Sequence, residues 1–262
     1  MDAYILALIF AGVLGLCVGS FLNVVIYRVP NEMNLATPAS HCPKCNYQLK
    51  WYDNIPVLSY LMLGGKCRKC KEHISFRYTI VEIVNALLWV LSVVMFWEKS
   101  IFYTVLVALA CSVLICMFFV DLEHMIIPDS FQIALLIIAV AGCFVSFDGI
   151  DDWKSKLIGM AVSGCLFLLL HIGCIVILKK DGLGGGDVKL MTVCGLLLGL
   201  ANTFLVILIG SVTACLLLLF IKRVKGYENY KEYPFAPFLT IGMLIALFFG
   251  SQVISWYMGL IS

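Results

Sequence analysis

The sequence predicts an all-α integral membrane protein with about eight transmembrane helices and one small polar insert. Hydrophobic residues make up 62% of the 262 positions and charged residues only 13%, and the mean hydropathy is +1.02. Long apolar runs recur along the chain, and about 20 residues at 1.5 Å each suffice to cross the hydrocarbon core of a bilayer. Polar residues gather instead in one stretch, residues 28–77. This composition excludes an ordinary soluble domain.

Each predicted span is an apolar run of roughly membrane-spanning length. The spans cover residues 4–27, 78–97, 101–120, 130–147, 157–178, 188–201, 203–221 and 236–259. The sixth is the weakest because it is short, and we expect its start at Asp187 to be partly unwound. No basic residue precedes the first span, and Arg28 follows it. We therefore expect a retained signal-anchor with its N-terminus outside, not a cleaved signal peptide.

The lysine and arginine residues predict the orientation of these spans. Fifteen of the eighteen lie in three loops of one face, at residues 28–77, 179–189 and 222–235. The opposite face holds the other three and an acidic loop at residues 148–152. The positive-inside rule makes the first face cytoplasmic, which fits eight spans with both termini outside.

Composition divides the chain into three parts: a first transmembrane helix at residues 1–27, a cytoplasmic insert at residues 28–77 and a seven-helix membrane core at residues 78–262. The insert holds four of the seven prolines and no long apolar run. It also holds two CxxC pairs, Cys42-Pro43-Lys44-Cys45 and Cys67-Arg68-Lys69-Cys70, separated by 21 residues.

Two CxxC pairs at this spacing predict a metal site. Each pair can present two thiolates to one side, and two such knuckles complete a tetrahedral zinc site. The reducing cytosol argues against two disulfides, and iron or a redox dithiol are the alternatives. Four thiolates leave no open coordination position, so we expect structural zinc that stabilises a segment with little core of its own. His41 and His73 are expected on the surface.

Two aspartates lie at the predicted cytoplasmic ends of spans. Asp121 ends the third span, and Asp187 follows Gly184-Gly185-Gly186 at the start of the sixth. A carboxylate beside a lipid-facing run is costly and is therefore a functional candidate. Two of them on one face predict a pair that shares one proton and activates a water, as in an aspartyl protease. Acid and base are not assigned within the pair, because the shared proton belongs to both.

Other polar residues nearby have simpler explanations. Asp129 starts the fourth span and complements the dipole of that helix. Glu123 and His124 are expected on a loop surface, and Lys189 at the membrane boundary. A phosphate-binding loop is a poor alternative at residues 184–186, because no strand precedes the glycines and no Lys-Ser/Thr pair follows them.

Several of these motifs resemble the type IV prepilin peptidases and, more distantly, the archaeal preflagellin peptidases and presenilin-type proteases. They are Gly184-Gly185-Gly186-Asp187-Val188-Lys189 at a span start, Asp121 ahead of Ile127-Pro128-Asp129, Gly19-Ser20-Phe21-Leu22-Asn23-Val24-Val25-Ile26-Tyr27-Arg28 in the first span, and Asn54-Ile55-Pro56-Val57-Leu58-Ser59 with Ile74-Ser75-Phe76-Arg77-Tyr78 around the second knuckle. The resemblance covers nearly the whole chain. The extra glycine before Asp187 is a mild departure.

The resemblance implies a multi-pass enzyme of the bacterial inner (plasma) membrane that cleaves the leader of type IV prepilin-like proteins at the cytoplasmic face. It implies Asp121 and Asp187 as the catalytic pair, and structural zinc on Cys42, Cys45, Cys67 and Cys70. Many bacterial members also methylate the new N-terminus with S-adenosylmethionine, and the residues that bind this donor stay unassigned. We expect prepilin-like substrates and membrane lipid as partners, and no nucleic acid.

Two polar residues inside spans, Asn23 and Glu82, fit a substrate groove. Glu82 is a candidate to bind the mature N-terminal amine or the methyl donor, but interhelical hydrogen bonds explain both residues equally well.

Three alternatives to a bifunctional enzyme stay open. One is a peptidase that does not methylate, and another is an inactive scaffold for pilus assembly. The third is a transporter or channel, which would relay ions through aspartates at the bilayer midplane. That reading places the aspartates at the wrong depth and leaves the tetracysteine insert unexplained.

Overall fold

The structure is a computed structural model that describes residues 2–145, 152–179, 183–225 and 233–261. The long elements in these ranges are all helices, which confirms the predicted all-α membrane fold. Most of the acidic loop at residues 148–152, together with Lys180 and the central part of the loop at residues 222–235, lies outside the described residues.

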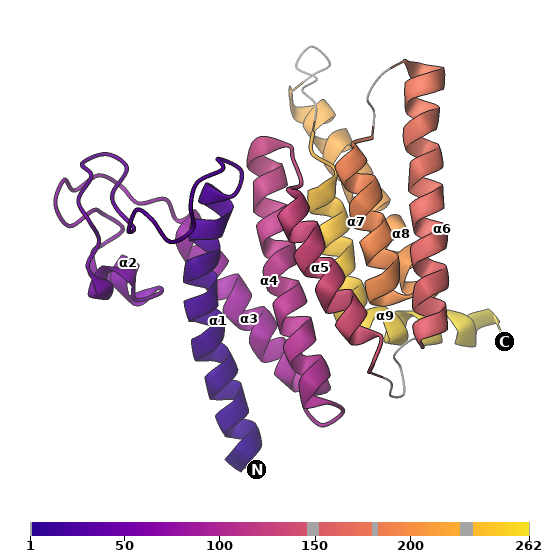
Figure 1. The fold of residues 1–262 in the computed structure, drawn as a ribbon, viewed down its shortest axis with the longest axis horizontal. Helices are drawn as coiled ribbons and strands as arrows, with labels where there is room; N and C mark the ends of the chain where they lie inside the picture. Colours follow the sequence, from indigo (N-terminus) through magenta and orange to yellow (C-terminus); the bar gives the residue numbers. More distant parts are fainter. Residues whose placement is uncertain (1, 146–151, 180–182, 226–232, 262) are drawn as a thin grey trace. The chain divides into compact units, whose positions relative to one another are not determined.

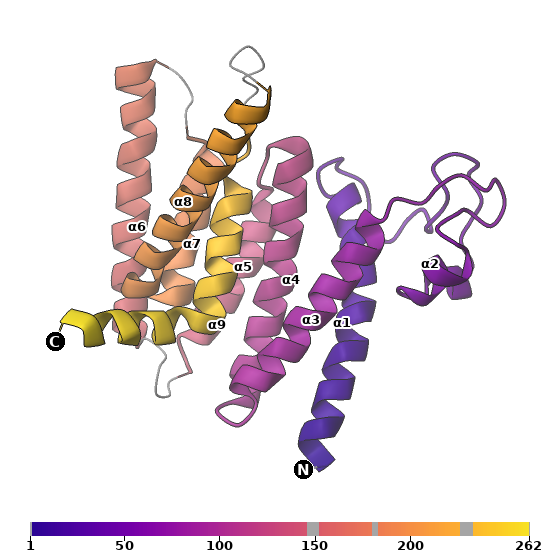
Figure 2. The same cartoon turned by 180° about the vertical axis from the view of Figure 1, so that it is seen from behind.

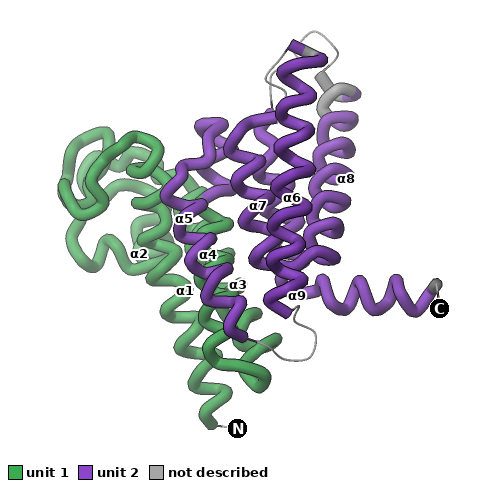
Figure 3. The backbone as a smooth tube through the Cα atoms, turned by 45° about the vertical axis from the view of Figure 1, so that its right-hand side comes forward, with its two compact units in different colours: residues 1–116 green, residues 117–262 purple. Residues whose placement is uncertain are grey.

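The chain forms two compact units, residues 1–116 and residues 117–262 (Figure 3). Unit 1 contains the first two long helices and the cysteine insert, and unit 2 contains the last five helices. Helix α4 begins in unit 1, and its last two turns belong to unit 2. The sequence predicted three parts with boundaries after residues 27 and 77, on the basis of composition. That division stays a prediction.

A helix occupies the place of each predicted span (Figure 1). These helices are α1 (Asp2–Arg28), α3 (Arg77–Phe96), α4 (Ile101–His124), α5 (Asp129–Gly142), α6 (Trp153–Gly173), α7 (Gly185–Leu198), α8 (Leu200–Lys225) and α9 (Ala236–Ile261). A π-helical turn at Cys174–Leu178 extends α6, and the short α2 (Leu58–Met62) lies in the insert.

Six of these helices are long and apolar enough to cross a membrane within the described ranges. The other two, α5 and α7, have 14 residues each, or about 21 Å at 1.5 Å per residue. The short α7 agrees with expectation, but α5 was expected to continue to residue 147 and ends at Gly142. Eight complete crossings therefore stay a prediction.

In unit 1, α1 and α3 pack side by side through small residues (Figure 2). A Cβ atom on Gly19 would lie 2.7 Å from the Cα atom of Glu82, so only glycine permits this approach. Asn85 Nδ2 donates to the carbonyl of Gly15 at 2.7 Å, and the Ser112 hydroxyl of α4 donates to Asn85 Oδ1 at 2.8 Å. Polar groups inside the unit are thus paired across three helices.

In unit 2, α6 packs against α7 and α8 packs against α9. A Cβ atom on Gly195 would overlap the backbone of Gly159, so α6 and α7 touch directly. Ser163 Oγ donates across that contact to the Met191 carbonyl at 2.8 Å. Gly199, with φ of +81°, turns the chain from α7 into α8. This packing fixes the start of α7, which carries Asp187.

Candidate functional site

Asp121 is buried near the C-terminal end of α4, with 5% of its surface exposed. The helix continues one turn further than predicted and ends at His124, because Met125 adopts φ of +54° and its N–H still bonds the Asp121 carbonyl. Glu123 and His124 therefore lie in the last helical turn, not in a loop, although both are exposed as expected.

The Asp121 carboxylate has one neighbour that sequence reasoning could not identify. The backbone N–H of Ala236, at the start of α9, donates to it. Its other oxygen, Oδ2, is buried without a hydrogen-bond partner among the described residues. Buried polar atoms normally have partners, so this oxygen is an exception.

Asp187 lies in the first turn of α7 and is partly exposed. Its carboxylate accepts a hydrogen bond from the backbone of Gly184 and is close enough to Asp121 for the two charges to repel. Both aspartates belong to unit 2. The structure therefore brings together the two carboxylates that the sequence places 66 residues apart.

The glycines before Asp187 serve close packing more than unusual backbone angles. None of Gly184, Gly185 and Gly186 has a positive φ. A Cβ atom on Gly186 would lie 3.3 Å from Cβ of Ile127, in the turn between α4 and α5. A Cβ atom on Gly185 would meet nothing within 4 Å. Position 186 is thus packed against protein, and position 185 is open.

A residue of helix α5 hydrogen-bonds to the glycine segment at the start of α7. Gln132 is buried in α5 and its amide donates to the Gly186 carbonyl at 3.3 Å, while its own Oε1 is buried without a partner in the described chain. Gln132 was not a candidate from the sequence, although a polar residue inside an apolar span is a signal of function or pairing.

Asp129 begins α5, as expected for a helix N-terminal residue. It also forms an ion pair with Lys189 of α7 at 2.7 Å, a contact the sequence did not indicate. Both side chains are more than half exposed, and exposed ion pairs add little stability. This ion pair joins α5 to α7, the helix that carries Asp187. It includes neither Asp121 nor Asp187.

The four insert cysteines gather into one cluster in unit 1, as predicted. Their sulfur atoms all lie within 4.8 Å of one another, with Cys42 Sγ 3.8 Å from Cys70 Sγ and Cys45 Sγ 3.9 Å from Cys67 Sγ. Tetrahedral zinc with bonds of about 2.3 Å to sulfur requires sulfur–sulfur distances of about 3.8 Å. The cluster has the geometry to hold a metal ion.

The two knuckles have the same backbone pattern. The N–H of Cys42 donates to the Tyr47 carbonyl at 2.9 Å, and the N–H of Cys67 donates to the Glu72 carbonyl at 2.8 Å. Backbone N–H groups of Cys70 and Lys69 lower the pKa of the Cys67 thiol to about 6. This favours the thiolate, which is the form that binds metal. His41 and His73 are exposed, as expected.

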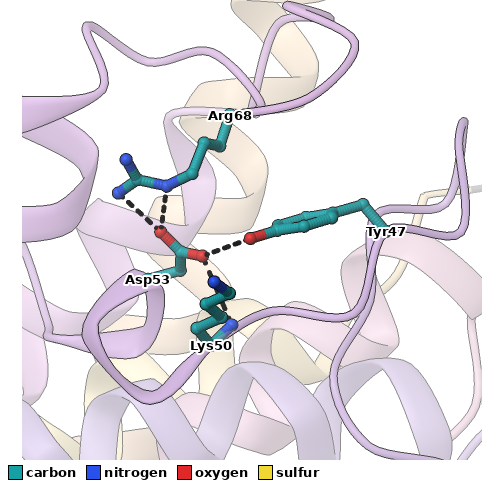
Figure 4. A network of polar contacts seen from close by, with 4 residues as sticks. All are labelled: Tyr47, Lys50, Asp53 and Arg68. Carbon is teal, nitrogen blue, oxygen red and sulfur yellow. Dashed lines mark hydrogen bonds and ion pairs between the residues drawn. The ribbon is translucent and has the colours of Figure 1, made fainter.

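Asp53 joins the two knuckles through a polar network (Figure 4). Its buried carboxylate pairs with Arg68 of the second knuckle at 2.8 Å. It also accepts from the Tyr47 hydroxyl at 3.4 Å and from the Lys50 N–H at 3.3 Å. The neighbouring carboxylate raises the pKa of Arg68 through this hydrogen bond. Asp53 was not a candidate from sequence, because its partners are set only by the fold of the insert.

Asn23 and Glu82 both hydrogen-bond between segments of unit 1. Asn23 Nδ2 donates to the Tyr78 carbonyl at 3.0 Å. Glu82 Oε2 accepts from the Val57 N–H at 2.8 Å, and the Ser20 hydroxyl also bonds this carboxylate. The interhelical role considered for them from sequence is therefore present in the structure.

Two family models together match most of the chain. The model of the bacterial peptidase A24 N-terminal domain matches residues 13–96, and that of the type IV leader peptidase family matches residues 108–219. The first match lies within unit 1, and the second begins shortly before unit 2. No solved structure matches the chain.

Relatives that carry the name prepilin leader peptidase/N-methyltransferase are similar over nearly the full length. The protein from Legionella pneumophila is 34% identical and the match covers 95% of this chain and 93% of that protein. The Pseudomonas aeruginosa protein is 32% identical, with 94% and 91% covered. The Myxococcus xanthus protein is 37% identical, with 89% and 70% covered. These matches confirm the resemblance drawn from the motifs, and the chain belongs to the type IV leader peptidase family.

Proposed function

We propose that this chain cleaves the leader peptide of prepilin-like proteins by aspartate-catalysed hydrolysis, with Asp121 and Asp187 as the catalytic pair. The family and the names of its relatives support the reaction and the substrate class. The assignment of residues rests on one observation: the buried Asp121 carboxylate has an oxygen without a partner and feels the charge of Asp187.

Two neighbouring carboxylates cannot both ionise readily, so the pair retains one proton at working pH. The charged carboxylate removes a proton from a water molecule as that water attacks the scissile carbonyl carbon. The neutral carboxyl donates its proton to the developing oxyanion, and a proton then passes to the leaving amine. Backbone donors from Ala236 and Gly184 hold the two side chains in place for this exchange.

The substrate has to present an extended backbone at the pair before it can be cut. The open space around Gly185 supports an approach from that side, because outside its chain neighbours and its own helix backbone no described atom lies within 4 Å of where its Cβ atom would be. The excess of basic residues in the loops at residues 28–77, 179–189 and 222–235, the second of which leads to Asp187, supports a site facing the cytoplasm from the bacterial inner membrane.

The same chain is proposed to bind one structural zinc ion and to methylate the new N-terminus of its product. Zinc would be held by Cys42, Cys45, Cys67 and Cys70, whose sulfur spacing fits tetrahedral coordination. Methylation is supported by the methyltransferase in the names of the relatives. S-adenosylmethionine would supply the methyl group.

Mass spectrometry of a prepilin incubated with the purified chain tests the aspartate assignment. Asp121→Asn and Asp187→Asn should each reduce cleavage at least about 10²- to 10⁴-fold, the typical contribution of general acid–base catalysis. Asp129→Asn is the matched control, since it changes an exposed carboxylate of the same unit, and it should keep most activity. Robust cleavage by either of the first two variants, in chains that remain inserted and folded, would exclude the pair.

A further inference from the structure

We propose that a cavity between α1, α3 and the insert of unit 1 binds S-adenosylmethionine, with Glu82, Asn23 and Thr79 as its polar contacts. The proposal rests on the proposed function, because it gives a location to the second of the two activities. When bound, S-adenosylmethionine supplies a methyl group made reactive by a positively charged sulfonium.

The cavity has the size of a small-molecule site. Its volume is about 690 Å³, and ligand pockets commonly measure about 300–1,000 Å³. Its walls come from the C-terminal half of α1, both knuckles and the first turns of α3, so it lies wholly within unit 1. The mature N-terminus of a pilin leaves the aspartate pair as a free amine, and methylating it requires a separate site for the donor.

Two side-chain oxygens of residues in the walls of this cavity lack hydrogen-bond partners. Asn23 Oδ1 and Thr79 Oγ1 are buried without a hydrogen bond among the described residues, and the two residues are only 5% and 3% exposed. Both line the cavity. A buried polar atom left without a partner destabilises a fold. A ligand that donates hydrogen bonds would satisfy both atoms.

Glu82 adds a buried carboxyl group to the same wall. It is 8% exposed, and its described hydrogen-bond partners, the Val57 N–H and the Ser20 hydroxyl, are neutral. Within the described ranges, no ion pair joins it to a basic side chain. A buried charge of this kind is most stable when an opposite charge is brought to it. The sulfonium and ammonium groups of S-adenosylmethionine are such charges.

The two arginines in the walls are already paired. The Arg28 guanidinium donates to the carbonyls of Asn34 and Leu35 at 2.9 and 3.0 Å, and Arg68 pairs with Asp53. Lys44 and Glu72 also line the cavity, but both are exposed. The buried ionisable group that has no charged partner is therefore Glu82, and a carboxylate favours a cation over an anion such as a lipid phosphate.

Val57 of the insert, which hydrogen-bonds to Glu82, has an energetically unfavourable backbone conformation. Val57 has φ of +60°, which is rare for a β-branched residue and is found mainly where the surrounding structure enforces it. Its N–H is the donor to Glu82. This bond fixes the insert against α3 at the wall of the cavity, so the contacts for a ligand are arranged before it arrives.

Isothermal titration calorimetry on the purified full chain tests the proposal directly. The probes are S-adenosylmethionine and S-adenosylhomocysteine, which lacks the methyl group and the sulfonium charge. Thr79→Val removes a hydroxyl that makes no hydrogen bond in the described chain, so a purely structural role predicts an unchanged or higher melting temperature and unchanged binding. We expect the melting temperature not to fall and the donor to bind about tenfold more weakly, as for one lost hydrogen bond.

Glu82→Gln removes the charge and keeps the shape. It should weaken binding of S-adenosylmethionine by at least about tenfold and reduce the preference over S-adenosylhomocysteine. Glu98→Gln is the matched control, since Glu98 is an exposed carboxylate of unit 1 outside the cavity, and it should bind as the wild type does. If Glu82→Gln does not fold, Thr79→Val decides alone.

Prepilin cleavage and methylation by the wild type are measured in parallel. Suppose that the wild type methylates, but Thr79→Val and folded Glu82→Gln bind the donor as tightly as the wild type. This result would overturn the cavity assignment and leave the proposed function standing. A wild type that cleaves but neither binds the donor nor methylates would overturn the methyl-transfer activity together with this site, while the peptidase assignment stands.

Discussion

At the scale of single residues, Asp121 is the one carboxylate in the described parts of unit 2 with a buried oxygen that lacks a hydrogen-bond partner. A fold that used it only for stability would surround both oxygens with donors, because an unpaired buried oxygen is costly. Here one backbone N–H from Ala236 is its described donor, and Oδ2 has none. An oxygen without a partner and a second carboxylate nearby are what the proposed shared-proton pair would need.

The adjacent glycines allow a matched pair of substitutions. Gly186→Ala places a methyl group 3.3 Å from Ile127, and overpacking of this kind costs about 1–3 kcal/mol. Gly185→Ala adds a methyl group to open space in the first turn of α7. We expect its stability to change by less than about 1 kcal/mol.

Thermal or denaturant unfolding and cleavage assays check both variants. Gly186→Ala should lose stability and activity together, because a shift of the turn also moves Asp187. If the two alanine variants lose equal stability, the contact with Ile127 does not explain the glycine at position 186.

At the scale of elements, the sequence predicted where helices form better than how long they are. Apolar runs locate α4 and α5, but the ends depend on single residues such as Met125, whose positive φ ends α4 at His124. The helix α5 ends at Gly142 although Cys143-Phe144-Val145 continues the apolar run. Hydropathy measures the preference for lipid and carries no information on where backbone hydrogen bonding stops.

The sites show the same limit. Short-range spacing identified the cysteine knuckles, since both cysteines of a pair lie in one turn. The partners of Asp53, Gln132 and Glu82 were not predictable, because each one comes from a different segment of the folded chain. Ala236 gives no sequence signal at all, since it acts through its backbone N–H.

The insert is predicted to depend on zinc. Metal analysis of the purified chain should find about one zinc ion per molecule, and Cys42→Ser combined with Cys45→Ser should release it and make the insert sensitive to limited proteolysis. Cys165→Ser changes an exposed cysteine of α6 and should retain the metal. A wild type without zinc, or with these thiols oxidised in fresh preparations, would contradict the assignment.

The Asp53 network should stabilise the insert independently of the metal. Asp53→Asn removes the charge that pairs with Arg68 and weakens the contact between the knuckles, so limited proteolysis of residues 28–77 should become faster. The zinc content should stay near that of the wild type, because no thiolate is removed. Glu32→Gln, an exposed neutralisation outside the knuckles, should leave the proteolysis rate unchanged. Loss of zinc in Asp53→Asn would mean that the network, and not the thiolates alone, holds the metal.

At the scale of the whole molecule, the two proposed activities use different compact units. The aspartate pair lies in unit 2, and the cysteine cluster and the cavity lie in unit 1. The family models divide in a similar way, with one match within residues 13–96 and the other at residues 108–219. Hydrolysis needs carboxylates and water, whereas methyl transfer needs an amine, a donor and a pocket, so we expect neither set of residues to be required for the other reaction.

Methylation should therefore be separable from cleavage. Asp187→Asn, supplied with a pilin that has already been processed, should still methylate its N-terminus, because the variant keeps every residue of unit 1. The double serine variant of Cys42 and Cys45 should lose more methylation than cleavage, since both cysteines belong to the knuckles beside the cavity. Mass spectrometry of pilin N-termini from each variant measures both reactions in one sample. If the two activities always decline together, a single shared site performs them. A wild type that leaves the N-terminus unmethylated would reduce this chain to a peptidase.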